Sequence, residues 1–160
     1  MLLTFVDIDR IQGEDEIVPR TFWGAVPPKG TVRLRIPVSN VVLLYYSGKH
    51  KCYGKADCKD VLLNIQKRHL RKEMDDIKYN FMIDDGGSIY EGRGWYTTTP
   101  VPTKYTPLTS KCITIAFVGD YSLEQPSQKM VTSVLKLISY GVARNVITKR
   151  HDFVTYRMDE

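Results

Sequence analysis

The sequence contains no apolar run long enough to cross a membrane, no internal repeat and no low-complexity tract. A membrane helix needs about 20 consecutive apolar residues, and the opening Met1–Asp7 is too short and too soon acidic for a signal peptide. Hydrophobic residues make up 42 % of the 160 residues and charged residues 26 %, which is typical of a soluble globular protein. This length is enough for one domain with a buried core.

A dense basic segment interleaved with aromatic residues is also lacking. The net charge is +5, and the densest basic group, Lys67–Lys72, is followed at once by Glu73, Asp75 and Asp76, which largely cancel it. Nucleic-acid-binding modules cluster their lysines and arginines. We therefore interpret the charge as a solvated basic surface and expect no nucleic-acid partner.

Cysteine is scarce, and the odd count of three argues against a complete disulfide framework. Cys52 and Cys58 lie in a polar loop, whereas Cys112 lies in an apolar run. Three interpretations are open at this point. A Cys52–Cys58 bridge beside a buried, free Cys112 favours an oxidising compartment. Three free thiols would suit a cytosolic protein, and a zinc site on Cys52 and Cys58 would lack a second pair of ligands nearby.

Apolar runs and apolar stripes alternate along the chain. Runs of strand type occur at Val41–Tyr46, Lys78–Ile83, Ile89–Arg93, Lys111–Asp120 and Phe153–Arg157. Three-four spacing predicts a helix capped by Asp57 with an apolar stripe of Val61, Leu62, Ile65, His69 and Leu70, and a helix after Pro126 with a stripe of Val131, Val134, Leu135, Ile138 and Val142. The order predicts an α/β fold, a central mixed β-sheet flanked by α-helices. His69 on its stripe is interpreted as a core residue rather than a ligand.

Several motifs occur in the order found in one known family. Tyr79–Phe81 with Ile83, followed by Gly87–Trp95, resembles the signature of the peptidoglycan recognition proteins, which belong to the superfamily of zinc-dependent N-acetylmuramoyl-L-alanine amidases. Further matches are Arg20 with Trp23–Ala25, Cys52 with Cys58, the strand residues Ile113, Ile115, Phe117, Gly119 and Asp120, and Pro126–Gln128. The resemblance implies a single amidase-like domain over residues 17–160, with a muropeptide groove and a Cys52–Cys58 disulfide. Residues 1–16 are interpreted as a leader or partly ordered segment.

The resemblance also identifies departures from the active relatives, which hold zinc with two histidines and a cysteine. Tyr45, followed by Tyr46 and Ser47, stands where a His-His-Thr-like motif begins, and Tyr156 stands at the second histidine. The cysteine would follow beyond Glu160, so we expect a domain that lacks the usual C-terminal segment. A zinc hydrolase needs about three protein ligands, and a neutral tyrosine is a poor substitute. These departures predict no metal, no cofactor and no amidase activity.

One alternative would retain a histidine ligand. His151 becomes a ligand if the alignment slips, but the pattern of Phe153 and Val154 then loses its register and Tyr45 is still a tyrosine. We therefore interpret Tyr45 and Tyr156 as lost ligand positions.

Groove contacts can also be proposed from the resemblance. They are Tyr45, Tyr46, Tyr79, Gly94, Trp95 and Lys111. The Gly94–Trp95 dipeptide is associated in the family with a preference for diaminopimelic-acid muropeptides, and Lys111 offers a cation to a ligand carboxylate. A plainer interpretation of the dipeptide is ordinary loop structure. A plainer interpretation of the lysine is an exposed surface residue. Tyr79 matches a tyrosine that assists catalysis in active relatives, and without zinc it is interpreted as a strand residue.

Three functions compete. The hypothesis favoured by the sequence is a non-catalytic domain of innate immunity with impaired muropeptide binding, because Tyr45 and Tyr156 add bulk and Pro100–Pro102 replaces a small polar stretch of relatives. Such a domain would act through protein contacts, with another peptidoglycan-recognition receptor domain as partner. The alternatives are a non-catalytic receptor for diaminopimelic-type peptidoglycan and, least favoured, a zinc amidase. All imply an extracellular location, secreted or on the ectodomain of a membrane receptor.

Overall fold

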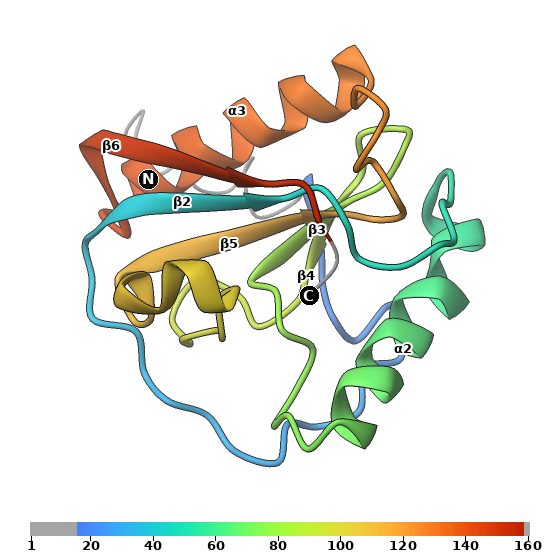
Figure 1. Ribbon diagram of the computed structural model, residues 1–160. Coiled ribbons are helices and arrows are strands. Elements are labelled where there is room, and N and C mark those ends of the chain that lie inside the picture. Colours follow the sequence, from blue (N-terminus) through green and yellow to red (C-terminus); the bar gives the residue numbers. More distant parts are fainter. Residues whose placement is uncertain (1–15, 159–160) are drawn as a thin grey trace, which may run out of the picture.

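The computed structural model describes residues 16–158, in which a six-stranded mixed β-sheet lies between helices (Figure 1). The strands are β1 (Ile17–Val18), β2 (Val38–Leu44), β3 (Phe81–Ile83), β4 (Ile89–Glu91), β5 (Cys112–Phe117) and β6 (Ile147–Tyr156). Their order is β1-β4-β3-β5-β2-β6, with β3 and β4 antiparallel and the other neighbouring pairs parallel. The predicted α/β class with a central mixed sheet is confirmed.

Strand β2 occupies the interior of the sheet, between β5 and β6. Val42 lies beside Thr114 of β5 and Val154 of β6, and residues 41–44 are buried. A strand covered on both faces is expected to be an unbroken apolar run, because neither row of side chains meets water. The strand begins at Val38, three residues before the predicted start.

Helix α3 (Gln128–Ala143) covers one face of the sheet. It begins after Ser127, whose Oγ accepts a hydrogen bond from the Met130 backbone N–H and so caps the helix. Its buried residues are Met130, Ser133, Val134, Leu137, Ile138 and Gly141. The predicted stripe was therefore wrong at Val131 and Leu135, which are 37 % and 60 % exposed. The sequence pattern could not resolve which of two adjacent stripes faces the sheet.

Helix α2 (Lys55–Arg71) packs on the opposite face of the sheet. Gly54, with φ of 82°, precedes it, so the predicted cap at Asp57 was wrong. Asp57 instead lies in the first turn, where its Oδ2 accepts a hydrogen bond from the Tyr53 N–H. Leu62, Ile65 and His69 are buried by this helix, so the prediction of a buried His69 is confirmed.

The last strand differs most from its prediction. It begins at Ile147 rather than Phe153, and its register against β2 shifts between the pairs Val38–Ile147 and Asn40–Asp152. The extra residues of β6 form a bulge, inside which the His151 ring contacts the Thr148 carbonyl oxygen at 2.9 Å. The polar residues of the bulge do not alternate with apolar residues, so nothing in the sequence pattern indicated that they belong to a strand.

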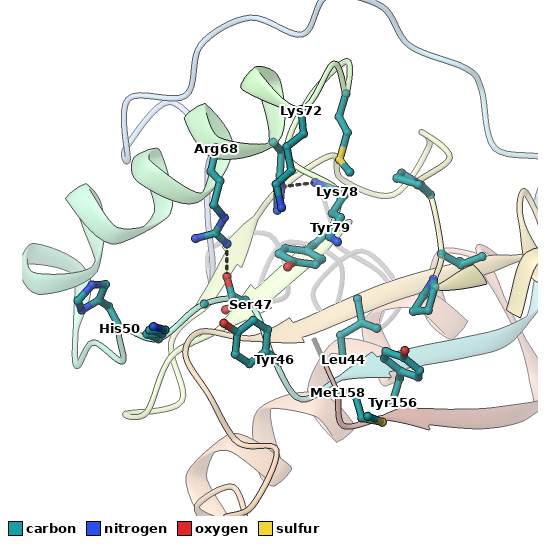
Figure 2. A pocket seen from close by; sticks show the side chains of 17 residues that line it. Leu44, Tyr46, Ser47, His50, Arg68, Lys72, Lys78, Tyr79, Tyr156 and Met158 are labelled. Atoms are coloured by element: carbon teal, nitrogen blue, oxygen red, sulfur yellow. Dashed lines mark hydrogen bonds between the residues drawn. The ribbon is translucent and has the colours of Figure 1, made fainter. Parts of the chain in front are cut away.

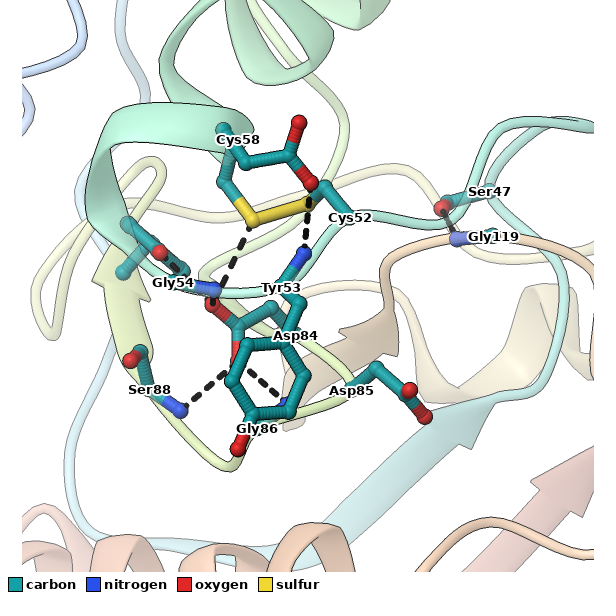
Figure 3. The surroundings of a disulfide bond; sticks show 12 residues. Ser47, Cys52, Tyr53, Gly54, Cys58, Asp84, Asp85, Gly86, Ser88 and Gly119 are labelled. Carbon is teal, nitrogen blue, oxygen red and sulfur yellow. Dashed lines mark hydrogen bonds between the residues drawn. A yellow bond between two sulfur atoms is a disulfide. The ribbon is translucent and has the colours of Figure 1, made fainter.

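The Cys52–Cys58 disulfide is present and joins the loop before α2 to its first turn (Figure 3). Beside it lies the buried carboxylate of Asp84, whose Oδ2 accepts hydrogen bonds from the Gly54 N–H at 3.0 Å and the Tyr90 hydroxyl at 2.7 Å. Burial, followed by this hydrogen bond, raises the pKa of Tyr90. Cys112 is a free, buried thiol, and burial raises its pKa to about 11.

The predicted leader falls almost wholly on residues 1–15, which lie outside the described range. Within residues 16–158, no helix combines the length and the apolar character that crossing a membrane requires.

Candidate ligand-binding cavity

A cavity of about 340 Å³ lies on the α2 side of the sheet (Figure 2). Leu44 and Tyr156 contribute from β2 and β6, Arg68 from α2, Lys72 from the C-cap of that helix, and Pro100–Pro102 from the loop before η1 (Thr103–Leu108). The remaining lining residues are Tyr46, Ser47, Gly48, Lys49, His50, His69, Met74, Lys78, Tyr79 and Met158. The cavity is thus assembled from segments far apart in the sequence.

The two adjacent tyrosines after β2 lie on opposite faces of the sheet. Tyr46 lines the cavity, whereas Tyr45 belongs to the core beneath α3 and packs edge-on against Phe117, with ring centroids 5.1 Å apart. Successive side chains of an extended chain point to opposite faces. The Arg157 guanidinium lies 4.1 Å from the centroid of the Tyr45 ring, a cation–π contact outside the cavity lining. Tyr46, not Tyr45, therefore shares the cavity with Tyr156.

The side chains around the cavity are basic. Lys49, Arg68, Lys72 and Lys78 line it, and in the described part of the chain, residues 16–158, neither aspartate nor glutamate lines it. Lys72 is the C-cap of α2, four residues after Arg68, and its backbone N–H donates a hydrogen bond to the Arg68 carbonyl oxygen, so the two residues lie on one side of the helix. Opposed low-dielectric walls strengthen the field of such a group of cations. The cavity therefore favours an anionic ligand.

Arg68 is held by the turn that follows β2. Its Nη2 donates a hydrogen bond to the Ser47 carbonyl oxygen, as Figure 2 shows. Ser47 is itself fixed to the loop after β5, since its N–H donates to the Gly119 carbonyl at 2.9 Å and its Oγ accepts from the Gly119 N–H at 2.9 Å. The guanidinium is thus tied to the sheet through one rigid turn.

His69 is a neutral group at the cavity wall. Its side chain is 2 % exposed, and its Nδ1 accepts a hydrogen bond from the Lys78 backbone N–H at 3.1 Å. Burial, with the charges of Lys78, Arg68 and other cations, lowers its pKa to about 3. The acceptor role of Nδ1 leaves the proton of the neutral imidazole on Nε2.

The other predicted groove residues lie elsewhere. Trp95 packs against Phe81, with ring centroids 4.4 Å apart, beneath α3. It lines a second cavity of about 290 Å³, together with Ile17, Pro19, Phe81, Glu91, Tyr96 and Arg144. Gly94 is buried and its carbonyl oxygen accepts a hydrogen bond from Asn80 Nδ2. Lys111 is exposed just before β5.

The structure thus brings together Tyr46, Tyr79 and Tyr156 from the predicted set, and not Tyr45, Gly94, Trp95 or Lys111. Sequence reasoning missed Arg68 and Lys72, which it had treated as part of a solvated basic surface. The available signal was their spacing of four residues beside the apolar stripe that carries His69.

Comparisons with known proteins agree with this architecture. Residues 36–158 match the family model of N-acetylmuramoyl-L-alanine amidase. Peptidoglycan recognition protein 1 of Bos indicus is 33 % identical over 160 residues, which cover 98 % of this chain and 82 % of the relative. The chain belongs to the peptidoglycan recognition protein family.

Solved structures of the family share its fold. Peptidoglycan recognition protein-LE, in complex with tracheal cytotoxin, a monomeric diaminopimelic acid-type peptidoglycan, superposes with a TM-score of 0.80 at 26 % identity, covering 88 % of this chain and 82 % of that one. The ectodomain of the Drosophila transmembrane receptor PGRP-LCa gives a TM-score of 0.77 at 28 % identity, covering 86 % and 82 %. The fold of this chain is therefore that of peptidoglycan recognition proteins.

The zinc ion implied by amidase relatives is not matched by the residues present. Tyr46 and Tyr156 offer phenol oxygens to the cavity, and of its two lining histidines, His69 already uses Nδ1 as an acceptor. Within residues 16–158, no three side chains of histidine, cysteine, aspartate or glutamate are grouped so that they could hold a metal ion. Imidazole, thiolate and carboxylate are the donors that zinc requires, so the described donor set does not fit it.

Proposed function

We propose that this chain is a non-catalytic peptidoglycan-recognition domain that binds an acid-bearing muropeptide in the cavity beside α2. One observation carries this proposal: among residues 16–158, four basic side chains and no carboxylate line a cavity of about 340 Å³. Stem peptides of diaminopimelic type carry free carboxylates, and charge-assisted hydrogen bonds to such groups are the strong ones. The relative solved with tracheal cytotoxin holds a ligand of this class on the same fold.

The absence of catalysis follows from the donor set. In zinc amidases a metal-bound water supplies the nucleophile at neutral pH, and the donor set of residues 16–158 does not fit zinc. Tyr46 and Tyr156 line the cavity, and a phenol oxygen is not among the imidazole, thiolate and carboxylate donors that zinc requires. We propose that a bound muropeptide is retained intact.

The location proposed for the domain is extracellular. The Cys52–Cys58 disulfide suits an oxidising compartment, and one structural relative is the ectodomain of a transmembrane receptor. The domain would serve innate immunity there by reporting bacterial cell-wall fragments.

A second function is favoured by one specific observation. Tyr156 and Met158 line the cavity at the end of β6, and their bulk narrows the space for a sugar–peptide ligand. A domain impaired in binding would act as a regulator or co-receptor through contacts with another peptidoglycan-recognition receptor domain. The sequence alone ranked this function first, partly on the bulk of Tyr45, which packs beneath α3 instead.

Calorimetric titration with a diaminopimelic-type muropeptide monomer tests the proposal. We expect saturable heat at micromolar ligand, and a mass spectrum of the recovered ligand with its lactyl–alanine amide bond uncleaved, with or without added zinc. No heat, together with capture of a purified receptor domain of the family, would establish the second function instead. Release of free stem peptide in the presence of zinc would refute the non-catalytic assignment.

A further inference from the structure

We propose that Arg68 makes the cavity selective for a ligand carboxylate over the corresponding carboxamide, and that the Ser47–Gly48 turn positions its guanidinium for this purpose. The inference rests on the proposed function, because it names the group that anchors the ligand in the same cavity.

The first argument is the unused hydrogen-bonding capacity of Arg68. A guanidinium carries five N–H donors, and in Arg68 one nitrogen donates to the Ser47 carbonyl oxygen. Within residues 16–158, the Arg68 guanidinium forms no ion pair and no other hydrogen bond. Arg68 is one of the residues that line the cavity.

Two other arginines show the contrast. Arg20 is bound bidentately by Asp76, with nitrogen–oxygen distances of 2.7 and 3.0 Å. Arg93 donates to the carbonyl oxygens of Ile77 at 2.6 Å and Thr98 at 3.1 Å. In both arginines, oxygen atoms of the protein already accept the guanidinium hydrogen bonds that a ligand carboxylate would need. Arg68 is half-buried like them and lines the cavity, but its guanidinium has one protein acceptor, the Ser47 carbonyl oxygen.

The second argument is preorganisation. Gly48 has a φ of +146°, and a Cβ at this position would lie 3.2 Å from Arg68 Nη1 and 3.4 Å from Nη2. The guanidinium therefore lies against the Gly48 backbone, and the Ser47 carbonyl fixes its direction. A side chain held in its binding conformation loses little entropy when the ligand arrives. The missing side chain of Gly48 is what permits this close approach.

The third argument is the geometry of the acceptor. A planar guanidinium matches the two oxygens of a carboxylate with two parallel hydrogen bonds. A carboxamide offers one oxygen, and its NH2 group would face the donors of Arg68. Lys72, one helical turn away, adds attraction for the anion but no such planar match. Arg68 is thus the residue that distinguishes the acid from its amide.

The experiment compares the free-acid muropeptide with its amidated form on four variants. Arg68→Gln removes the charge and Arg68→Lys keeps it without the planar guanidinium. Gly48→Ala leaves the net charge unchanged and displaces the guanidinium. Lys67→Gln is the matched control, because Lys67 precedes Arg68 on α2, is exposed and does not line the cavity.

The expected results are changes in the Kd ratio of amide to acid. Wild type and Lys67→Gln should prefer the acid by about tenfold or more, as charge-assisted hydrogen bonds allow. Arg68→Gln should abolish the preference, and Arg68→Lys and Gly48→Ala should reduce it. Equal losses in Arg68→Gln and Lys67→Gln would overturn the proposal, since only the general field would then act. A preference that survives Arg68→Gln would overturn it as well.

A second measurement separates this inference from the proposed function. The Nε–Hε resonance of Arg68, assigned with Arg68→Lys, is followed by NMR during titration with glutarate and, as the control, glutaramide. A shift with glutarate alone in a protein that binds no muropeptide supports the Arg68 site while the proposed function fails. Muropeptide binding with an unmoved Arg68 resonance refutes the Arg68 site while the proposed function holds.

Discussion

Beneath α3, Tyr45 packs edge-on against Phe117 in an apolar core; on the α2 face, the next residue, Tyr46, lines a basic cavity. The α2 face also buries polar side chains such as Gln66, His69 and Asp76. Buried polar groups cost free energy unless they are hydrogen-bonded. One face of the sheet thus stabilises the domain, while the other combines stability with a site for a charged ligand.

The largest expected effect is the loss of folding stability in acid, which arises from His69 on the α2 face of the sheet. The pKa of His69 is about 3 in the fold against 6.5 as its ordinary value, so the unfolded state binds its proton first as the pH falls. The contribution of neutral His69 to stability is therefore present above pH 6.5 and is lost as the pH falls from 6.5 to about 3, by roughly 5 kcal/mol in all. Urea unfolding at pH 7.0, 5.5 and 4.5 measures the loss, and His69→Gln should flatten it. An equally steep decline in His69→Gln would assign the acid sensitivity to other groups.

Alanine substitutions of the two adjacent tyrosines should also differ in their cost to folding stability, because the two rings lie on opposite faces of the sheet. Tyr45→Ala removes a ring packed in the core and should cost about 3 kcal/mol in the free energy of unfolding. Tyr46→Ala removes a ring at the open cavity and should cost about 1 kcal/mol or less. Denaturant midpoints of both variants provide the measurement. Similar costs at the two positions would contradict the division of the faces.

The disulfide belongs to the α2 face, and its loss should have an intermediate effect. Removing the bridge in Cys52→Ser/Cys58→Ser should lower the free energy of unfolding by about 2 kcal/mol. Cys112 serves as the internal control, since burial raises its pKa to about 11 and its thiol should resist alkylation at pH 7.5. Mass spectrometry after iodoacetamide should find label at Cys112 only once urea is added. Rapid labelling of the native protein would show that this core opens readily.

The smallest effect is expected on the outer side of α3. Leu135 is 60 % exposed, so Leu135→Ala should change stability by no more than about 0.5 kcal/mol. Leu137, two residues later and fully buried, is the matched position, and Leu137→Ala should cost about 3 kcal/mol. Thermal unfolding of the pair checks the orientation of the helix. A larger loss of stability in Leu135→Ala than in Leu137→Ala would instead support the buried stripe that the sequence pattern predicted.

Much of the fold was accessible from local patterns. The apolar runs at residues 41–44 and 112–117 became neighbouring strands β2 and β5, since an unbroken run of that length suits a strand buried on both faces. The site was less accessible. The bulge of β6 and the exposed face of α3 depend on contacts between segments distant in sequence, and these leave no periodic signal.

The sequence by itself determined the mixed sheet, the Cys52–Cys58 loop and the family, because runs, spacings and motifs are properties of short segments. Only the tertiary structure decided that Tyr46 rather than Tyr45 lines the cavity. It also decided that Arg68 meets Ser47 across 21 residues of chain. The physical reason is the two-residue period of an extended chain: a tyrosine pair presents one ring to each face, and which ring meets the cavity depends on where α2 packs.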